Sequence, residues 1–244
     1  MTHPLMQVVG AARAAPIVIT CDHAGNVVPD DVGALGVCEA DLNRHIAYDI
    51  GAAGVSLALG ELLEAPVVLN YVSRLVIDPN RGADDPTLVM QLYDGTIIQG
   101  NRDLTQAQIE ARRQNYYDPY HTAYEELLHA RTDPIVVAIH SFTPQLNDRP
   151  PRPWHIGILH AGDTRLSTPL LTELRKEPDL CVGDNEPYDG HLPGDSIDQH
   201  ALRQGRHNAL IEIRNNLIET PAQQRAWAER LAPILNRVFE QVKG

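Results

Sequence analysis

Residues 18–26 read VITCDHAGN, an apolar run that changes abruptly to charged and turn-forming residues. The preceding Pro and the Val and Ile residues of PIVIT (16–20) predict a strand that is buried on both faces. Gly25 and Asn26 are typical of a turn, but a turn does not need the Asp22–His23 pair before them. We therefore interpret His23 as a functional group at the end of a buried strand, and we look for its partners at the ends of other strands.

Further apolar runs of the same kind follow along the chain and predict the rest of a sheet. They are PVVLNYVSRLVI (66–77), PIVVAIH (134–140), HIGILH (155–160), LCVG (180–183) and ALIEIR (209–214). Between them, apolar residues recur at helical spacing over 42–57 and 227–238. Strands that alternate with helices predict a three-layer α/β/α fold, phosphorylase/hydrolase-like, around a mostly parallel or mixed central sheet. We expect residues 1–244 to form a single catalytic domain.

Local signals place several helix boundaries. Thr105 with Gln108, and Thr220 with Gln223, have the spacing of capping boxes, which predicts a helix start at each threonine. Pro233 falls inside the second helical pattern and is expected to bend or break it, because proline lacks the backbone donor that a helix needs.

Composition restricts the partners of the protein. With 20 Lys and Arg against 32 Asp and Glu, the formal net charge is -12, which disfavours nucleic acid and anionic membranes. No apolar run has the length of a membrane-spanning helix. Three widely spaced cysteines predict free, mostly buried thiols, and the N-terminal segment lacks the basic start of a signal peptide, so we expect a cytoplasmic protein.

Polar groups at strand ends suggest a metal site. His23 and His140 each follow an apolar strand, and two histidines with one carboxylate are a sufficient ligand set for catalytic zinc. Asp22 and Asp49 are the nearby carboxylates. Asp22 adjoins His23, so the two side chains point opposite ways on a strand, and Asp22 suits an orienting role better than a ligating one. Asp49 shares a face with His45 if this segment is helical.

A second group of charges lies on the last predicted strand. Glu212 stands between two isoleucines, where an unpaired carboxylate is costly unless it has a use such as general base catalysis. Arg214 has the same strand parity and could clamp a substrate carboxylate, as could Arg74 and Arg81.

Structural interpretations remain open beside these functional ones. Glu212 and Arg214 can form a simple ion pair, and either strand-end histidine can be a hydrogen-bonded turn residue. Residues 78–81 can be a turn with exposed charges. The other histidines, among them His121, have no context that raises them above surface residues.

Seven short segments occur in an order that is similar to one known family. They are DHAGN (22–26), HIAYDIGA (45–52), SRLVIDPNR (73–81), HSFTP (140–144), RPWHIG (152–157), GDNEPY (183–188) and IEIR (211–214). Over about residues 17–218 the chain resembles the N-formylglutamate amidohydrolases. The resemblance implies a zinc hydrolase related to zinc carboxypeptidases and aspartoacylases. It also implies cleavage of N-formyl-L-glutamate to formate and L-glutamate, the last step of one route of histidine breakdown.

The resemblance also implies roles for individual residues. His23 and His140 would be zinc ligands, and Glu212 would be the base that deprotonates the zinc-bound water. The side chains that hold the substrate carboxylates would be Arg74, Asn80, Arg81 and Arg214. In aspartoacylase relatives a Glu three residues after the first His completes the zinc site, but this position is Asn26 here, and Asp49 is our choice of third ligand.

The chain resembles a divergent branch of the family, which leaves alternatives open. His160 stands where relatives tend to have Tyr. We expect a small acidic N-acyl amino acid as substrate and Zn²⁺ or another divalent metal as cofactor. Another zinc N-acyl amino acid deacylase, a carboxypeptidase-like hydrolase, and a non-catalytic protein that binds an acidic ligand on the same fold are the other candidates. The sequence does not give the oligomeric state.

Overall fold

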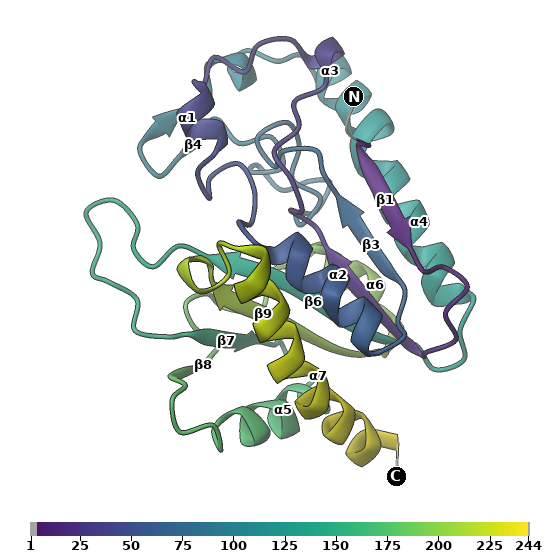
Figure 1. Cartoon of the computed structure of the whole chain (residues 1–244). Helices are drawn as coiled ribbons and strands as arrows, with labels where there is room; N and C mark the ends of the chain where they lie inside the picture. The colour runs from purple at the N-terminus through teal and green to yellow at the C-terminus, as the bar shows by residue number, and fades with distance from the viewer. Residues whose placement is uncertain (1–3, 244) are drawn as a thin grey trace.

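A computed structural model describes residues 4–243, so the first three residues of the N-terminal segment considered above lie outside it. Its centre is a seven-stranded mixed sheet (Figure 1). In spatial order the strands are β1 (Met6–Val9), β3 (Val67–Asn70), β2 (Ile17–Cys21), β6 (Ile135–Phe142), β9 (His207–Arg214), β7 (Ile156–Leu159) and β8 (Val182–Asp184). The four strands β3, β2, β6 and β9 are parallel. β1 and β7 run antiparallel to their inner neighbours, and β8 runs parallel to β7.

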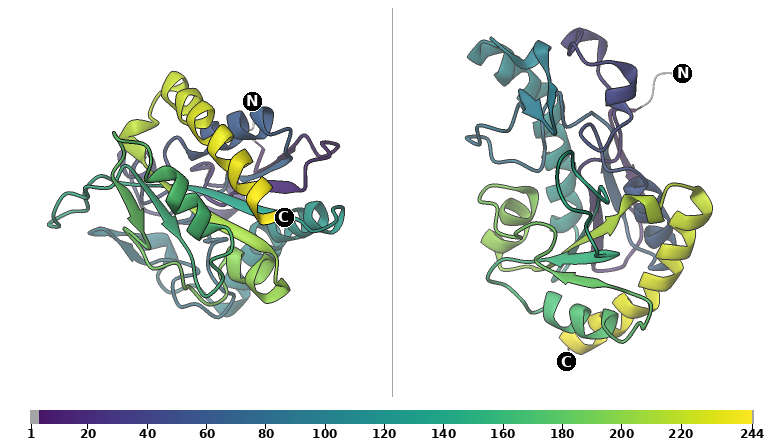
Figure 2. Two further views of the ribbon diagram at one scale, coloured as in Figure 1. Left: turned by 90° about the horizontal axis from the view of Figure 1, so that it is seen from below. Right: turned by 90° about the vertical axis from the view of Figure 1, so that its left-hand side faces the viewer.

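Helices cover both faces of the sheet, as two further views show (Figure 2). One face packs against α2 (Ala52–Leu62), α5 (Ser167–Leu174) and α7 (Pro221–Lys243), and the other against α4 (Asp118–His129) and α6 (Ser196–His200). Successive strand residues serve the two cores in turn: Ile19 and Val137 join the first, Val18 and Val136 the second. This alternation is the geometry of a strand that is buried on both faces. The predicted three-layer α/β/α fold is confirmed.

A third apolar cluster lies beyond one end of the sheet and includes Leu75, Val76 and Ile98. Short elements surround it: α1 (Glu39–Leu42), the hairpin of β4 (Leu92–Tyr93) and β5 (Thr96–Ile97), α3 (Gln106–Arg112) and a π-helical turn (Arg113–Tyr117). Single 3-10 turns complete the list at Asp30–Val32, Gln99–Asn101, Leu202–Gln204 and Asn215–Leu217. The irregular segments around residues 28–48 and 72–98 pack their apolar side chains in this third cluster.

The strand predicted over 66–77 is too long, since β3 ends at Asn70. The Asn70 amide donates to the carbonyl oxygens of Asp22 and Val72, at 3.0 and 3.1 Å. The Ser73 hydroxyl donates to the carbonyl of Ala47 at 3.0 Å. Side chains thus satisfy backbone groups that a sheet ladder would otherwise pair, which lets the segment leave the sheet and stay buried.

The helix predicted over 42–57 is wrong in its first half, because α2 begins only at Ala52. Gly51 precedes it with a left-handed φ of 81°, and a Cβ there would lie 2.1 Å from the carbonyl oxygen of Ile218. The backbone N–H of Asp49 donates to the carbonyl of His23 at 2.9 Å. Asp49 therefore lies on a turn that is fixed to the end of β2, and not on a helix.

Both predicted capping boxes are present, at Thr105 and at Thr220. Pro233 does not break α7, which continues through it. Glu229, whose carbonyl loses its helical partner, is exposed and can be solvated instead. The three cysteines are free, but Cys38 and Cys181 are exposed, contrary to the expectation of mostly buried thiols.

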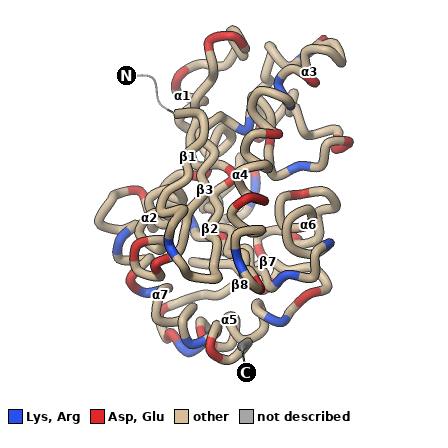
Figure 3. The backbone as a smooth tube through the Cα atoms, turned by 90° about the vertical axis from the view of Figure 1, so that its right-hand side faces the viewer, with Lys and Arg blue, Asp and Glu red and all other residues tan. Residues whose placement is uncertain are grey.

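Acidic and basic residues are interspersed along the backbone (Figure 3). Some form ion pairs between elements: Arg230 of α7 bonds Glu177 at 2.8 Å and Asp179 at 2.8 Å. Within residues 4–243, no helix combines the length and the apolar character needed to cross a membrane.

Candidate functional site

Three predicted site residues meet at one edge of the sheet. β2, β6 and β9 are parallel, so their carboxyl ends lie together. His23 follows β2, while His140 of β6 is directly opposite Glu212 of β9 in the strand register. All three side chains are buried, with at most 6% of their surface exposed. The prediction that these groups gather at the strand ends agrees with this geometry.

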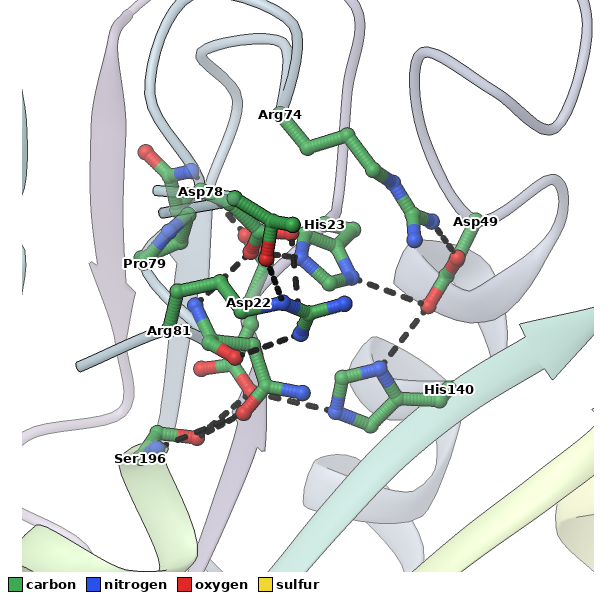
Figure 4. A network of polar contacts seen from close by, with 12 residues as sticks. Asp22, His23, Asp49, Arg74, Asp78, Pro79, Arg81, His140 and Ser196 are labelled. Atoms are coloured by element: carbon green, nitrogen blue, oxygen red, sulfur yellow. Dashed lines mark hydrogen bonds and ion pairs between the residues drawn. The ribbon is translucent and has the colours of Figure 1, made fainter. Parts of the chain in front are cut away.

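Asp49 joins them from the turn before α2 (Figure 4). Its Oδ2 lies 2.9 Å from Nδ1 of His140 and 3.4 Å from Nδ1 of His23. One ligand atom from each of the three residues lies within 4.8 Å of the others. The other carboxylate oxygen, Oδ1, accepts from Arg74 and lies 3.4 Å from Nδ1 of His45. Asp49 is therefore held so that one oxygen faces both histidines.

The far nitrogens of the two histidines each face a separate carboxylate. Nε2 of His23 lies 2.6 Å from Oδ1 of Asp78, and Nε2 of His140 lies 3.0 Å from Oδ2 of Asp22. The expected orienting role of Asp22 thus fits the structure, but it orients His140 and not the adjacent His23. Asp78 is fully buried, which rules out the alternative that it is a turn residue with an exposed charge.

Further donors fix Asp22 in place. The Tyr120 hydroxyl donates to its Oδ1 at 2.6 Å, and the Ser196 hydroxyl donates to its Oδ2 at 2.8 Å. Burial alone would raise the pKa of Asp22, but the hydrogen bond and charge of His140 hold this pKa well below its ordinary value. Asp22 is therefore an ionised acceptor. Sequence periodicity gave no sign of Tyr120 or Ser196 as its partners, because both come from distant helices.

The tautomers of the two histidines follow from these contacts. An ionised carboxylate accepts a hydrogen bond from the N–H at Nε2, so in a neutral imidazole Nδ1 carries no proton and presents its lone pair. Burial and the nearby charge of Arg74 lower the pKa of His23 to about 4, so its ring is neutral. Burial also acts to lower the pKa of His140, but the contact with Asp22 raises it above its ordinary value. Two Nδ1 atoms and a carboxylate oxygen thus converge on one point, where either a proton or a metal ion is needed.

The converging donor set fits a divalent metal. Two imidazole nitrogens and one carboxylate oxygen make up a common protein set at catalytic zinc, and the hydrogen bond of each far nitrogen to a carboxylate is the usual support for a ligating histidine. His23, Asp49 and His140 are the residues that could hold the ion.

Among the described residues, Glu212, in contrast to the two histidines and Asp49, has a buried oxygen without a hydrogen-bond partner. Within residues 4–243, its Oε2 makes no hydrogen bond although it is buried. Burial raises the pKa of Glu212, against the opposing charges of His140 and Arg74. The ion pair with Arg214, which the sequence left open as a structural alternative, is not formed in the described part of the chain, where the Arg214 guanidinium bonds other groups. The carboxyl group lines the same cavity as His140, which is its partner in the strand register.

A cavity of about 170 Å³ opens onto these groups. Arg74, Asn80 and Arg81, to which the family resemblance assigns substrate binding, are among the residues that line it. Arg214 is not among its lining residues: its guanidinium donates to the carbonyl of Arg152 at 3.1 Å and to the Asn216 side chain at 3.0 Å. Arg214 shares the strand face of Glu212 but reaches a different place.

The segment between β8 and α6 covers the cavity and contributes Tyr188, Asp189 and Gly190 to its lining. The Tyr188 hydroxyl accepts from Arg152 at 3.0 Å. This segment approaches the sheet closely at Gly157, where a Cβ would lie 1.9 Å from the carbonyl oxygen of Glu186. Gly157 is paired with Glu212 across β7 and β9, so the cover reaches the face of the sheet that carries the Glu212 side chain.

Known proteins resemble this chain in sequence and in fold. The family model described as N-formylglutamate amidohydrolase matches residues 15–219. A solved gene product of Agrobacterium tumefaciens, Atu2144, is 33% identical with a TM-score of 0.93, over 99% of this chain and 97% of that one. No curated protein matches the chain significantly.

Two more distant structures share the fold. An N-formylglutamate amidohydrolase from Ralstonia eutropha JMP134 is 21% identical with a TM-score of 0.76, over 98% of each chain. A bacteriophage poly-gamma-glutamate hydrolase is 12% identical with a TM-score of 0.51, over 97% of this chain and 89% of that one.

Proposed function

Because the chain belongs to the N-formylglutamate amidohydrolase family, we propose that it is a zinc-dependent hydrolase of N-formyl-L-glutamate or a closely related N-acyl amino acid. The products would be L-glutamate and formate, as in the last step of one route of histidine breakdown. The observation that carries the proposal is the convergence of His23, Asp49 and His140 on one point, with the unpartnered Glu212 beside it.

His23, Asp49 and His140 would hold the metal. When bound, such an ion supplies a Lewis acid that activates water and polarises a carbonyl group. Asp22 and Asp78 would keep both imidazole rings in the orientation that presents Nδ1.

Glu212 would move the proton. A buried carboxylate with a raised pKa takes a proton from an attacking water more readily than an ordinary one. As the water oxygen bonds to the acyl carbon, this proton passes to the carboxylate of Glu212. When the carbon–nitrogen bond breaks, Glu212 gives the proton to the departing amine, so the side chain returns to its starting state.

Arg74, Asn80 and Arg81 would bind the substrate. All three line the cavity, and the two guanidinium groups offer positive charge to the carboxylates of an acidic amino acid. Arg74 also contacts Asp49, so substrate binding and the metal site share this residue. Arg214 is left out of the proposed clamp, because its guanidinium bonds elsewhere.

The test is formate release from N-formyl-L-glutamate by protein stripped with a chelator, with and without one equivalent of zinc. Zinc-dependent release supports the metal, the reaction and the substrate together. Tight zinc binding without formate release would contradict the substrate and point to a different N-acyl amino acid, to be identified with a substrate panel. Zinc binding with no turnover on the panel would favour a non-catalytic binding protein, and absence of zinc binding would overturn the metal site.

A further inference from the structure

A chain of hydrogen bonds behind the cavity connects α4 and α6 with the loop that carries Asp78 and Arg81. Nε2 of His121 lies 3.0 Å from the carbonyl oxygen of Pro79, and its Nδ1 lies 2.8 Å from Nε2 of His200. Nδ1 of His200 in turn lies 2.6 Å from Oε2 of Glu125. The two histidines are 8% and 6% exposed, so these contacts replace water.

The chain ends on an anchored carboxylate. Arg206 donates to both oxygens of Glu125, at 3.1 and 2.7 Å. It also donates to the carbonyl of His200 at 2.8 Å. A bidentate guanidinium keeps a carboxylate ionised and fixed in direction. Burial acts to raise the pKa of Glu125, but the bonds from Arg206 and His200 lower it to about 2.

The other end of the chain holds a functional loop. Pro79 stands between Asp78, which bonds His23, and the cavity residues Asn80 and Arg81. The Tyr117 hydroxyl donates to the carbonyl of Arg81 at 2.8 Å. Tyr117 and His121, one helical turn apart, thus bond two carbonyls of this loop. Without these two bonds, the backbone on either side of Pro79 would lose the contacts that fix its position.

Donor and acceptor rules fix the protons along the chain. The carbonyl of Pro79 can only accept, so Nε2 of His121 carries a proton. If His121 is neutral, its Nδ1 accepts, and Nε2 of His200 must donate. The contact of Nδ1 of His200 with the ionised Glu125 then requires a second proton on the same ring. Two neutral imidazoles carry two ring protons in total. All three hydrogen bonds exist together only when His121, His200 and Glu125 share a third proton.

We propose that His121 and His200 are positioning residues of the site, and that this single extra proton keeps Pro79, and with it Asp78 and Arg81, in the geometry that substrate and metal require. When the proton leaves, two acceptors face each other and one contact must break. The catalytic consequence rests on the proposed function, but the proton count does not.

The surroundings determine when the proton leaves. Burial holds the pKa of His200 below its ordinary value although the contact with Glu125 acts to raise it, so the proton is lost as pH rises through the lower part of the imidazole range. Other groups of the packed elements face this pair as well. They are Tyr117, Tyr120, Tyr124, His129, Arg206 and Asp22.

Glu125→Gln gives a sharp test. The amide nitrogen of Gln can donate to Nδ1 of His200 while its carbonyl accepts the 2.7 Å bond from Arg206. The contacts of both histidines are then complete without the extra proton, and only the 3.1 Å bond from Arg206 is lost. Glu126→Gln is the matched control, because Glu126 is the next residue on the same helix and is exposed. Ring-nitrogen NMR of His200 in metal-free protein, and kcat/KM for N-formyl-L-glutamate, are measured between about pH 5 and 8, where imidazoles titrate.

In the wild type and in Glu126→Gln, we expect His200 to change from doubly to singly protonated, with a matching step in kcat/KM. In Glu125→Gln, His200 should stay neutral throughout and the step should vanish. A wild-type His200 that is neutral at every pH, or a step that Glu125→Gln leaves unchanged, would overturn the proposal. If the wild type releases no formate, the proposed function fails, and the NMR result alone decides the proton count.

His121 is tested by two substitutions of different kinds. His121→Phe keeps a ring but removes both bonds, and we expect KM to rise roughly tenfold with a smaller change in kcat. His121→Gln, whose amide can donate to the carbonyl of Pro79, should recover most of this loss. Equal kinetic constants in the wild type and His121→Phe would contradict a positioning role. If His121→Phe does not fold, the Glu125→Gln comparison remains decisive.

Discussion

Replacement of Asp78 by Asn should weaken metal binding without removing any ligand. Asp78 accepts from Nε2 of His23 at 2.6 Å and from the backbone N–H of Asn80 at 2.9 Å, and both bonds use Oδ1. In Asp78→Asn an oxygen can remain at that place, so only the negative charge is lost. The charge makes the imidazole of His23 more basic and therefore a better ligand.

The expected size follows from the strength of this contact. A hydrogen bond to a charged group contributes about 1.5–3 kcal/mol, against about 1 kcal/mol for a neutral pair. The two values differ by about 1.4 kcal/mol, and this free energy corresponds to a factor of ten in affinity. Asp78→Asn should therefore bind zinc about tenfold more weakly than the wild type. Asp78→Ala removes the acceptor as well and should weaken affinity about a hundredfold.

Zinc affinity is measured by competition with a chromogenic chelator, and folding is checked by circular dichroism. Asp84→Asn is the matched control, because Asp84 lies in the same loop and is exposed. It removes the same charge from the protein and should leave zinc affinity within a factor of two or so of the wild type. The reasoning is refuted if Asp78→Asn binds zinc as tightly as the wild type, or if Asp84→Asn weakens binding equally.

Three other substitutions test the site and its framework. Glu212→Gln should bind zinc as the wild type does, but its turnover should fall by roughly 10²–10⁴-fold, which is the usual contribution of a general base. The assay is formate release at saturating zinc, and full activity would contradict the proposed role of Glu212. Burial, with a contribution from Asp22, raises the pKa of Asp195 to about 7, so the folded state binds this proton more tightly than the unfolded chain, and stability falls as pH rises from about 4 to about 7. Asp195→Asn should flatten that part of a urea-denaturation pH profile, and an unchanged profile would contradict the assignment. Gly51→Ala should cost about 2–4 kcal/mol, because a Cβ would meet the carbonyl of Ile218 at a left-handed φ, and thermal unfolding would show it.

The pattern of buried strands was enough to locate three residues of the candidate site. The carboxyl ends of parallel strands lie together, and functional groups are common there, so the sequence alone predicted that His23, His140 and Glu212 are close to one another. Parity placed Arg214 on the face of Glu212 in the same way. It did not show where a long, flexible side chain would reach, and the guanidinium bonds loop carbonyls instead.

The residues that support the proposed metal site were harder to predict, because they lie on irregular segments without helical or strand periodicity. Asp78 follows a buried segment in which Asn70 bonds the carbonyl of Val72 and Ser73 bonds that of Ala47, and such side-chain bonds leave no repeating pattern in the sequence. Asp49 was found on an expected helical face, yet it lies on a turn. The i, i+4 spacing brings it beside His45 in either conformation.

Gly157 lies where the sheet, which carries the proposed hydrolytic groups, meets the segment that covers the cavity. The groups proposed for hydrolysis stand on or beside the strands, whereas the cover that includes Tyr188 and Gly190 is an irregular segment resting on a glycine. Insertions and exchanges in such a segment are tolerated more easily than changes in a sheet. Related chains can therefore acquire different acyl substrates by altering the cover, provided that position 157 remains without a side chain.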